Sequence, residues 1–537
     1  MLMNKITTSN MGLLIASSFF MLLTGNWTFF GTLLDIYPFG DNVFFVTSVF
    51  AVTFLAILLL LILLSLFLST RFVIGFCLLA AAASGYFSGN YGIVIDDIMI
   101  QNVMETDLAE TSDLLNPSYL SRLFFLAIVP IGLMFYFKRV KKTFLKEFFF
   151  KLAVAIGALA VSVAIVFLSS DQFASFFREH KSVRYLINPV YPVYSLGQYI
   201  NKTYINTDQN VFKESGIVSE IESDDEGREL TILVVGETAR ADHFSLNGYE
   251  RVTNPLLAQE PNLITFPDVM SCGTSTAISV PCLFSLQHKD EFDVSQAKYH
   301  ENVIDLLHNA GVSVLWRDNN SDSKGVADRV EFQDYKTSTL NTKCDDECRD
   351  IGMLEGLQEY IDQQTGDVLI VLHMMGSHGP AYFERYPHEF AKFQPECKTL
   401  ELSECSLEEI RNAYDNTILY TDYFLSNIIK LLKNNVDKYE PVMFYISDHG
   451  ESLGENGLYL HGLPYLIAPD TQKKVAMLVW GADESDLDLE RTRQTSAKSY
   501  THDSIASTLL KLFEIETDKP VKHVDEAPIY LKDEVDE

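Results

Sequence analysis

The stretch that decides the fold is Leu230–Glu237, with the sequence LTILVVGE, in which a strand-forming run ends almost at once in a glutamate. Two later stretches have the same form. Val368–His373 is an apolar run that ends in a histidine, and Val442–His449 ends in an Asp-His pair. Strands of a buried parallel sheet are continuous apolar runs, and ligands bind outside the carboxyl ends of such strands. The sequence therefore predicts a parallel sheet that brings these polar side chains to one edge.

Strand-like and helix-like segments alternate on both sides of these three runs, from Leu230 to about Ile529. This alternation predicts an α/β domain with a largely parallel sheet. The remaining strand candidates are Val312–Trp316 and Val475–Val479, and the helical candidates are Glu301–Ala310, Met353–Gln363, Leu407–Leu432 and Ser499–Leu512.

The first 170 residues hold nearly all of the long hydrophobic runs. A helix of about 20 apolar residues spans a bilayer, so these runs predict five transmembrane helices. The candidates are Met11–Phe30, Val43–Ser69, Phe72–Tyr86, Tyr119–Phe137 and Leu152–Ser169. A cleaved signal peptide is the alternative for the first run, but further spans follow it and no clear small-residue cleavage site precedes Asp35. We therefore predict a transmembrane domain over residues 1–170.

Residues 171–228 are predicted to form interfacial helices and a linker. Gln172–Leu186 interleaves aromatic and basic side chains, which suits a helix at the bilayer surface. Ser219–Arg228 is polar and acidic, as expected of a hinge. The α/β domain then occupies residues 229–537.

Basic residues predict the orientation in the membrane. Lys138–Lys142 lies between the fourth and fifth spans, whereas the loops Asp35–Asp41 and Asn90–Pro117 carry no Lys or Arg. Positively charged loops stay in the cytoplasm, so the N-terminus is predicted to be cytoplasmic. Five spans then place the α/β domain outside the cytoplasm.

The cysteines support an oxidising compartment. One of the seven, Cys77, lies in an apolar run, and the other six fall into pairs that are close in sequence. Such pairs favour disulfides over a zinc site, although the Cys344–Cys348 spacing is also compatible with a metal. The pairs are Cys272 with Cys282, Cys344 with Cys348, and Cys397 with Cys405.

The acidic composition excludes one class of partner. With 72 Asp and Glu against 41 Lys and Arg, the formal net charge is −31. Nucleic-acid binding needs clustered basic residues that neutralise phosphates, so no nucleic-acid partner is expected. Most of the acidic excess is expected to be solvated surface.

The polar strand ends predict a metal site beside a nucleophile. Glu237, Asp448 and His449 offer the oxygen and nitrogen ligands that zinc accepts, and the Thr274 hydroxyl would complete four-coordination. A hydroxyl held by a metal loses its proton more easily and becomes a nucleophile. A helix predicted to start near Thr274 would point backbone N–H groups at an anion there, and Lys324 would add positive charge for phosphate.

Each of these residues also has a structural interpretation. Glu237 would serve as a helix cap, Asp448-His449-Gly450 as an ordinary turn, and Lys324 as a solvated lysine. His373, His378 and His461 would be either satisfied histidines or acid–base groups, substrate ligands or ligands of a second metal. Asn102, Thr106 and Glu110 share one helix face in an outer loop, which is either a solvated surface or a polar site at the membrane.

The segments that carry this chemistry resemble those of the phosphoethanolamine transferases, and most closely the lipid A branch that includes the mobile colistin-resistance enzymes. The resemblance covers nearly the whole chain, including five spans and the loop Gln101–Thr106. Its motifs are Val235–His243, Ser271–Ala277, Gly376–Pro380, Ser447–Glu455 and Tyr459–Gly462.

The resemblance implies an alkaline phosphatase or sulfatase-like α/β fold and a role for each site residue. Thr274 matches the nucleophile that carries phosphoethanolamine, and Glu237, Thr274, Asp448 and His449 match a zinc site. The resemblance allows a second zinc near His378 and His461. Matches around the substrate phosphate are Lys324, His373, His378 and His461, of which the first three are expected to be catalytic. Matches linked to the lipid substrate are Asn102, Thr106 and Glu110, and the resemblance supports disulfides within the three cysteine pairs.

The expected function is transfer of phosphoethanolamine from phosphatidylethanolamine to a phosphate of lipid A through a covalent Thr274 intermediate. The expected protein is a monomeric, multi-pass enzyme of the inner membrane of a Gram-negative bacterium, and its product would give resistance to polymyxins such as colistin. Alternatives are transfer to a core sugar or a periplasmic glucan, and a phosphatase or sulfatase-like hydrolase. A sulfatase would need a Cys or Ser where this chain has Thr274.

Overall fold

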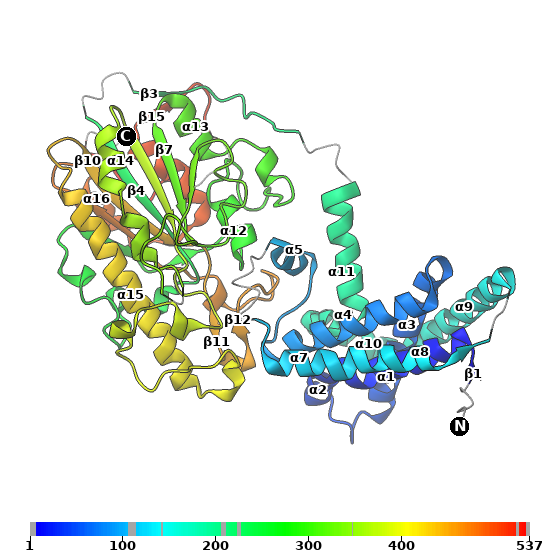
Figure 1. The fold of residues 1–537 in the computed structure, drawn as a ribbon. Helices are drawn as coiled ribbons and strands as arrows, with labels where there is room; N and C mark the ends of the chain where they lie inside the picture. The colour runs from blue at the N-terminus through cyan, green and yellow to red at the C-terminus, as the bar shows by residue number, and fades with distance from the viewer. Residues whose placement is uncertain are drawn as a thin grey trace. The chain divides into compact units, whose positions relative to one another are not determined.

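The computed structural model describes residues 7–105, 114–140, 143–205, 211–222, 227–345, 347–521 and 526–532 (Figure 1). The chain divides into two compact units. The helical unit comprises Met1–Gln101 and Leu114–Asn201, and the sheet unit comprises Asn102–Asp113 and Lys202–Glu537.

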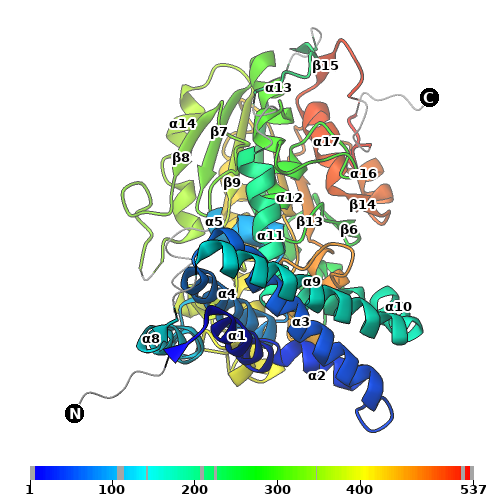
Figure 2. The same ribbon diagram turned by 90° about the vertical axis from the view of Figure 1, so that its right-hand side faces the viewer.

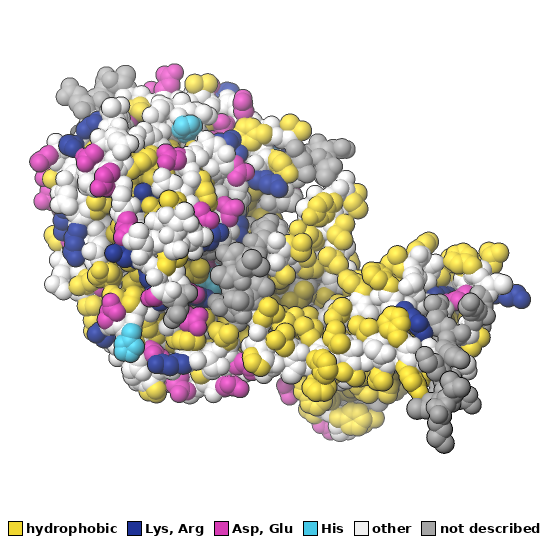
Figure 3. Space-filling view, viewed as in Figure 1, with side chains coloured by type: hydrophobic (Ala, Val, Ile, Leu, Met, Phe, Trp, Pro, Cys, Tyr) yellow, Lys and Arg dark blue, Asp and Glu magenta, His cyan; other side chains and the backbone are white. Residues whose placement is uncertain are grey.

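Long apolar helices make up the helical unit, and the face of this unit seen in Figure 3 is largely hydrophobic. Up to Ile200 the helices are α1 (Asn10–Gly25), α2 (Trp27–Ile36), α3 (Val43–Phe67), α4 (Thr70–Asn90), α5 (Asp97–Glu105), α7 (Pro117–Leu123), the π-helix η1 (Phe124–Ile128), α8 (Val129–Tyr136), α9 (Phe144–Leu168), α10 (Ser170–Glu179), the 3₁₀ helix η2 (Lys181–Leu186) and α11 (Val190–Ile200).

Four spans of the described chain are long and apolar enough to cross a membrane, and a fifth results if the bent pair α1 and α2 counts as one span. The four are Val43–Phe67, Thr70–Asn90, Pro117–Tyr136 and Phe144–Leu168, which confirms the four later spans predicted from hydropathy. Their ends differ by up to eight residues. The largest difference is in the last span, whose helix begins at Phe144 and not at Leu152, because its first turns carry Lys146, Glu147 and Lys151 and are less apolar.

The predicted first span is bent by 62° between α1 and α2. At the break, the Asn26 side chain donates to the carbonyls of Met21 (3.0 Å) and Asn188 (2.8 Å), and the Asn188 amide donates back to Asn26 (2.8 Å). A buried amide away from water must be paired, and these bonds replace the helical ones that are lost at the bend.

The sheet unit contains a seven-stranded sheet in the order β5-β13-β10-β4-β9-β7-β8. The five strands from β10 to β8 are parallel, whereas β13 is antiparallel to both β10 and β5. The strands are β4 (Glu229–Gly236), β5 (Leu263–Phe266), β7 (Ser313–Asp318), β8 (Glu331–Asp334), β9 (Val368–His373), β10 (Glu440–Ser447) and β13 (Met477–Gly481).

Helices cover both faces of this sheet, as the continuous apolar strands require. One core joins β4, β9 and β10 to α12 (Thr276–Leu283), α13 (Val303–Ala310) and α17 (Ile505–Leu512) (Figure 2). On the other side lie α14 (Leu357–Gln363) and α15 (Leu407–Lys433) (Figure 1). The predicted α/β class with a largely parallel sheet is confirmed.

Shorter elements complete the unit. The helix predicted over Met353–Gln363 begins as a 3₁₀ turn, Asp350–Leu354, and the one predicted over Ser499–Leu512 begins only after a 3₁₀ turn at His502–Ser504. The short strands are β3 (Ser219–Ile221) with β15 (Ile515–Thr517), β6 (Val269–Met270) with β14 (Tyr500–Thr501), and β11 (Ser452–Leu453) with β12 (Tyr459–Leu460), and α16 spans Leu489–Thr495.

Candidate active site

The candidate site lies at the carboxyl edge of the parallel strands. Glu237 follows the last residue of β4, His373 is the last residue of β9, and Asp448 follows the last residue of β10. The strands are in register here, because Gly236 pairs with Ser447 and Val235 with His373. The predicted convergence of the strand ends is therefore present in the fold.

Glu237, Asp448 and His449 form a buried cluster that could hold a metal ion, with ligand atoms within 4.8 Å of one another. The His449 Nε2 atom lies 3.4 Å from Glu237 Oε1 and 3.3 Å from Asp448 Oδ2. All three side chains have no exposed surface. Within the described residues, Glu237 Oε1 and Asp448 Oδ2 are buried with no hydrogen-bond partner, so each has a lone pair directed at the cluster.

The electrostatics of the cluster indicate a missing positive charge. Burial, together with repulsion from Asp448, raises the pKa of Glu237 to about 8. Burial raises the pKa of Asp448 to about 7 and lowers that of His449 well below its ordinary value. Two carboxylates that cannot be neutralised by solvent need a cation.

The loop before α12 brings two threonines to the site. Thr274 is buried, and its hydroxyl donates to the carbonyl of Leu463 (2.6 Å). The Thr276 hydroxyl donates to Glu237 Oε2 (3.1 Å) and lies 3.4 Å from His449 Nε2. The hydroxyl that contacts the carboxylate and imidazole cluster here therefore belongs to Thr276, which the sequence did not single out.

Two further histidines lie beside the cluster. The His461 ring lies 4.3 Å from the His449 ring and 5.6 Å from the His378 ring, measured between centroids. His461 Nδ1 is hydrogen bonded to Glu451 Oε2 (2.8 Å), and the Tyr382 hydroxyl donates to the other oxygen of Glu451 (2.5 Å). Glu451 thus fixes the orientation of His461.

His373 is oriented by Asp318, the last residue of β7. His373 Nδ1 lies 2.8 Å from Asp318 Oδ2, which also accepts from Trp316 Nε1 (3.0 Å). Both side chains are fully buried, and although burial opposes it, His373 lowers the pKa of Asp318. The other ring nitrogen of His373, Nε2, is buried, and no described residue bonds to it.

Three supporting residues were missed by the sequence analysis. Asn320 donates to Glu237 Oε2 (2.8 Å) and to the carbonyl of Met374 (2.8 Å), and so holds the glutamate in place. Asp318 and Glu451 orient histidines. The signal available for Asp318 was its position, since it follows the predicted strand Val312–Trp316 as closely as Glu237 follows its own.

The other predicted residues are placed as follows. The Lys324 ammonium donates to the carbonyl of Ser321 (2.6 Å) on the loop after β7. Asn102 lies on α5. Thr106 and Glu110 lie outside the described residues. The three predicted disulfides, Cys272–Cys282, Cys344–Cys348 and Cys397–Cys405, are confirmed, and among the described cysteines Cys77 alone is free.

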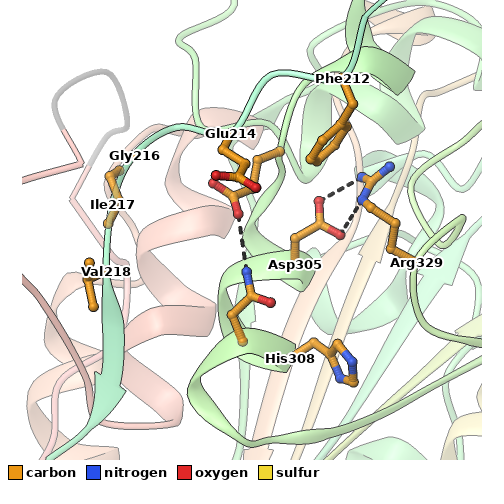
Figure 4. A pocket seen from close by; sticks show the side chains of 10 residues that line it. Phe212, Glu214, Gly216, Ile217, Val218, Asp305, His308 and Arg329 are labelled. Carbon is orange, nitrogen blue, oxygen red and sulfur yellow. Dashed lines mark hydrogen bonds and ion pairs between the residues drawn. The ribbon is translucent and has the colours of Figure 1, made fainter.

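A separate cavity of about 460 Å³ lies between α13 and the segment Phe212–Val218 (Figure 4). Three of its charged side chains have partners: Arg329 donates to Asp305 (2.6 and 2.7 Å), and Asn309 donates to Glu301 (3.2 Å). None of the residues predicted for the site lines this cavity.

Comparison with known proteins agrees with this geometry. The profile of the family described as phosphoethanolamine transferase EptA/EptB matches residues 53–204, and the sulfatase profile matches residues 229–515. The phosphatidylethanolamine transferase Mcr-1 of Escherichia coli is 44% identical over 522 residues, which cover 94% of this chain and 95% of that protein. The chain belongs to the phosphoethanolamine transferase family.

The family likeness extends over the whole structure. The phosphoethanolamine transferase EptA of Escherichia coli K12 is 38% identical over 514 residues and covers 94% of both chains. The solved structure of the integral membrane protein lipooligosaccharide phosphoethanolamine transferase A from Neisseria meningitidis superposes with a TM-score of 0.88 at 34% identity, covering 94% of this chain and 95% of that one. The expected fold and family are thereby confirmed.

Proposed function

We propose that this chain transfers phosphoethanolamine from phosphatidylethanolamine to a phosphate of lipid A. The observation that carries the proposal is the buried, uncompensated cluster of Glu237, Asp448 and His449 beside the loop of Thr274. Membership in the family indicates that the transferred group is phosphoethanolamine, and the apolar helices suit lipid substrates. Lipid A as acceptor is supported by the length and identity of the match to the Mcr and EptA proteins.

Glu237, Asp448 and His449 would hold zinc. Their donor set is the one that zinc accepts, and the two carboxylate oxygens without partners fit a cation. A bound zinc ion would lower the pKa of the Thr274 hydroxyl and offset negative charge on the transferring group. The raised pKa values of Glu237 and Asp448 are what such a site is expected to show without its ion.

In the first half-reaction the Thr274 hydroxyl gives its proton to one imidazole of the site, that of His378 or His461, and its Oγ attacks the phosphorus of phosphatidylethanolamine. The bond between phosphorus and the diacylglycerol oxygen breaks, and that oxygen takes the proton from the same imidazole. Thr274 then carries phosphoethanolamine. Phosphoryl transfer depends mainly on positioning and charge stabilisation, which is the role we assign to Lys324 and His373.

In the second half-reaction a lipid A phosphate gives the proton of one P–OH group to the same imidazole, and the freed oxygen attacks the same phosphorus. The bond from phosphorus to Thr274 Oγ breaks, and Oγ takes that proton from the imidazole. The product carries an additional amine, so the outer membrane becomes less anionic. Cationic peptides such as polymyxins are attracted to anionic surfaces, and resistance to them follows. Asn102, Thr106 and Glu110 are assigned to the lipid substrate.

We place the enzyme in the inner membrane with its N-terminus in the cytoplasm and its sheet unit in the periplasm, as a monomer. Six cysteines joined as disulfides in the sheet unit support an oxidising compartment. The basic loop between the last two spans supports the orientation.

Mass spectrometry of lipid A from cells that express the chain tests the proposal. The wild type is expected to add one phosphoethanolamine, and Thr274→Ala to add none. The same phosphoethanolamine should be found on the Thr274 peptide of the purified wild type after incubation with donor alone. Unmodified lipid A together with modified core sugars or glucans would show that the acceptor is one of these and not lipid A. Transfer by Thr274→Ala would overturn the covalent route.

A further inference from the structure

The loop that carries Thr274 is attached to a second loop, residues 461–473, which we call the clamp loop. The Ser271 amide donates to the carbonyl of Lys473 (2.8 Å), and the Gly462 amide donates to the carbonyl of Thr274 (2.7 Å). The Thr274 hydroxyl donates to the carbonyl of Leu463 (2.6 Å). Any movement of the clamp loop is therefore transmitted to the nucleophile.

Lys289, which follows α12 in sequence, is bound at the junction of these two loops. Its ammonium donates to the carbonyl of Ser271 (3.1 Å) and lies 3.1 Å from the centroid of the Tyr465 ring. The Tyr465 hydroxyl donates to the same carbonyl (3.0 Å). Lys289 thus contacts both loops at once, by a hydrogen bond to one and a cation–π contact with the other.

Lys289 is half-buried, and charged groups of both signs lie near it. The Lys289 backbone amide donates to Asp503 (2.7 Å), whose other oxygen lies 3.3 Å from His288 Nε2. Asp503 and Asp290 favour the charged ammonium and Lys473 disfavours it, but burial has the largest effect and lowers the pKa of Lys289 to about 8. The ammonium is therefore mostly charged at pH 7 and mostly neutral well above pH 8.

We propose that Lys289 is a positioning residue for phosphoryl transfer, whose charged ammonium holds the Ser271 carbonyl against Tyr465 and so fixes the loop that presents Thr274. The inference rests on the proposed function. Ser271 is three residues from the nucleophile, and displacement of a reacting group by about 1 Å costs on the order of 100-fold in rate. A charged donor also binds a carbonyl more strongly than the neutral amine does.

The test is single-turnover formation of phosphoethanolamine-Thr274 in the full-length protein, with phosphatidylethanolamine in mixed micelles, followed by peptide mass spectrometry. Lys289→Met is expected to slow labelling by about 10- to 100-fold, with little change in the donor concentration for half-maximal rate. Tyr465→Phe keeps the ring and loses one donor, so a smaller loss is expected. Lys474→Met is the matched control, because Lys474 is exposed and its ammonium pairs with Asp268 (2.9 Å).

The pH profile separates positioning from mere stability. Wild-type labelling should fall as pH rises through about 8, where the ammonium loses its proton. In Lys289→Arg the charge persists, so the fall should move to higher pH. Superimposable profiles for wild type and Lys289→Arg would overturn the proposal, as would wild-type labelling by Lys289→Met. The comparison of pH profiles between wild type and Lys289→Arg tests the positioning role even if Lys289→Met does not fold.

Failure of the proposed function looks different. If wild-type Thr274 is never labelled by phosphatidylethanolamine, the function is wrong and Lys289 has no role in it. If the wild type is labelled and the Lys289 variants match it, only the positioning role is wrong.

Discussion

At the scale of single residues, the active site is organised around two carboxylates that have no counter-charge of their own. Glu237 and Asp448 are fully buried and face the neutral ring of His449. A buried charge without a partner costs roughly several kcal/mol, so this arrangement fits the cation site proposed for it. The stability of the sheet unit should therefore depend on metal and on pH together.

The first prediction concerns chelator-treated protein. The pKa of Glu237 in the metal-free fold is about 8, above its ordinary value of 4.5, so the native state binds more protons than the unfolded state between these values. Stability without metal must then fall as pH rises across this window. Melting temperatures of the metal-free protein should decrease from pH 5 to pH 8, and Glu237→Gln should flatten the decrease. Added zinc should raise the melting temperature of the wild type far more than that of Glu237→Gln.

The second prediction concerns the Asp318–His373 pair. Asp318→Asn keeps the shape of the side chain but replaces the carboxylate that fixes the Nδ1 proton. Loss of such an orienting partner typically costs about 10- to 100-fold in activity or metal affinity. We expect Thr274 labelling to slow by that factor with the fold retained by circular dichroism. Asp334→Asn is the control, since Asp334 is the exposed register partner of Asp318 on β8. An unchanged labelling rate in Asp318→Asn would contradict the orienting role.

Sequence reasoning identified the site residues at the ends of strands, but not the residues whose side chains hydrogen bond to them and keep them in place. Glu237, Asp448 and His449 each follow an apolar run within three residues, which is a local signal. Asn320 reaches Glu237 across 83 positions of the chain, and a side-chain bond of that kind has no local signature. Thr276 was overlooked because it and Thr274 stand two residues apart in one motif, and rotamers decide which hydroxyl points at the cluster.

At the scale of elements, the strand ends are positioned by close packing between neighbouring strands. Gly236, the last residue of β4, has no room for a side chain, because a Cβ atom there would lie 2.4 Å from the Tyr445 hydroxyl on β10. The glycine leaves room for the Tyr445 side chain to pack against the end of β4, directly before Glu237. The position of the Glu237 carboxylate thus depends on the absence of one methyl group.

The third prediction follows from this packing. Gly236→Ala should destabilise the sheet unit by about 1–3 kcal/mol, as overpacking of a core does, and should lower zinc occupancy measured by elemental analysis. Gly366→Ala is the matched control, since a Cβ atom there would meet nothing within 4 Å. Normal zinc occupancy in Gly236→Ala, with Gly366→Ala also normal, would show that the packing of Tyr445 against Gly236 does not set the ligand geometry.

The elements themselves were predicted where the pattern was long and regular. Helix α15 extends over Leu407–Lys433, close to the predicted Leu407–Leu432, because its periodicity is sustained and Ser406 caps it with Glu409. The direction of β13 was not predictable, since an apolar run reads alike in both directions. The bend at Asn26 was missed because its partner, Asn188, is 162 residues away.

At the scale of the whole molecule, the open question is which side of the membrane each loop faces. Charge asymmetry predicts that the loop around Asp41 is periplasmic and that the loop around Thr143 is cytoplasmic. The native cysteines do not interfere with labelling, because six form disulfides and Cys77 is buried. The orientation can therefore be tested with single added cysteines.

The fourth prediction is the labelling pattern. A membrane-impermeant maleimide added to cells with a permeabilised outer membrane should label Asp41→Cys but not Thr143→Cys. Both variants should be labelled after the inner membrane is lysed, which serves as the control for accessibility. The reverse pattern would invert the orientation and place the disulfides in a reducing compartment.

The bond between Cys272 and Cys282 closes a covalent ring around the nucleophile, since Thr274 lies between the two cysteines. Thiols stay reduced in the cytosol and are oxidised in the periplasm. In the orientation proposed above, a newly made chain would leave the ribosome with this ring open, and the ring would close only after export. Oxidation would then restrict the Thr274 loop only on the side of the membrane where the acceptor is proposed to lie.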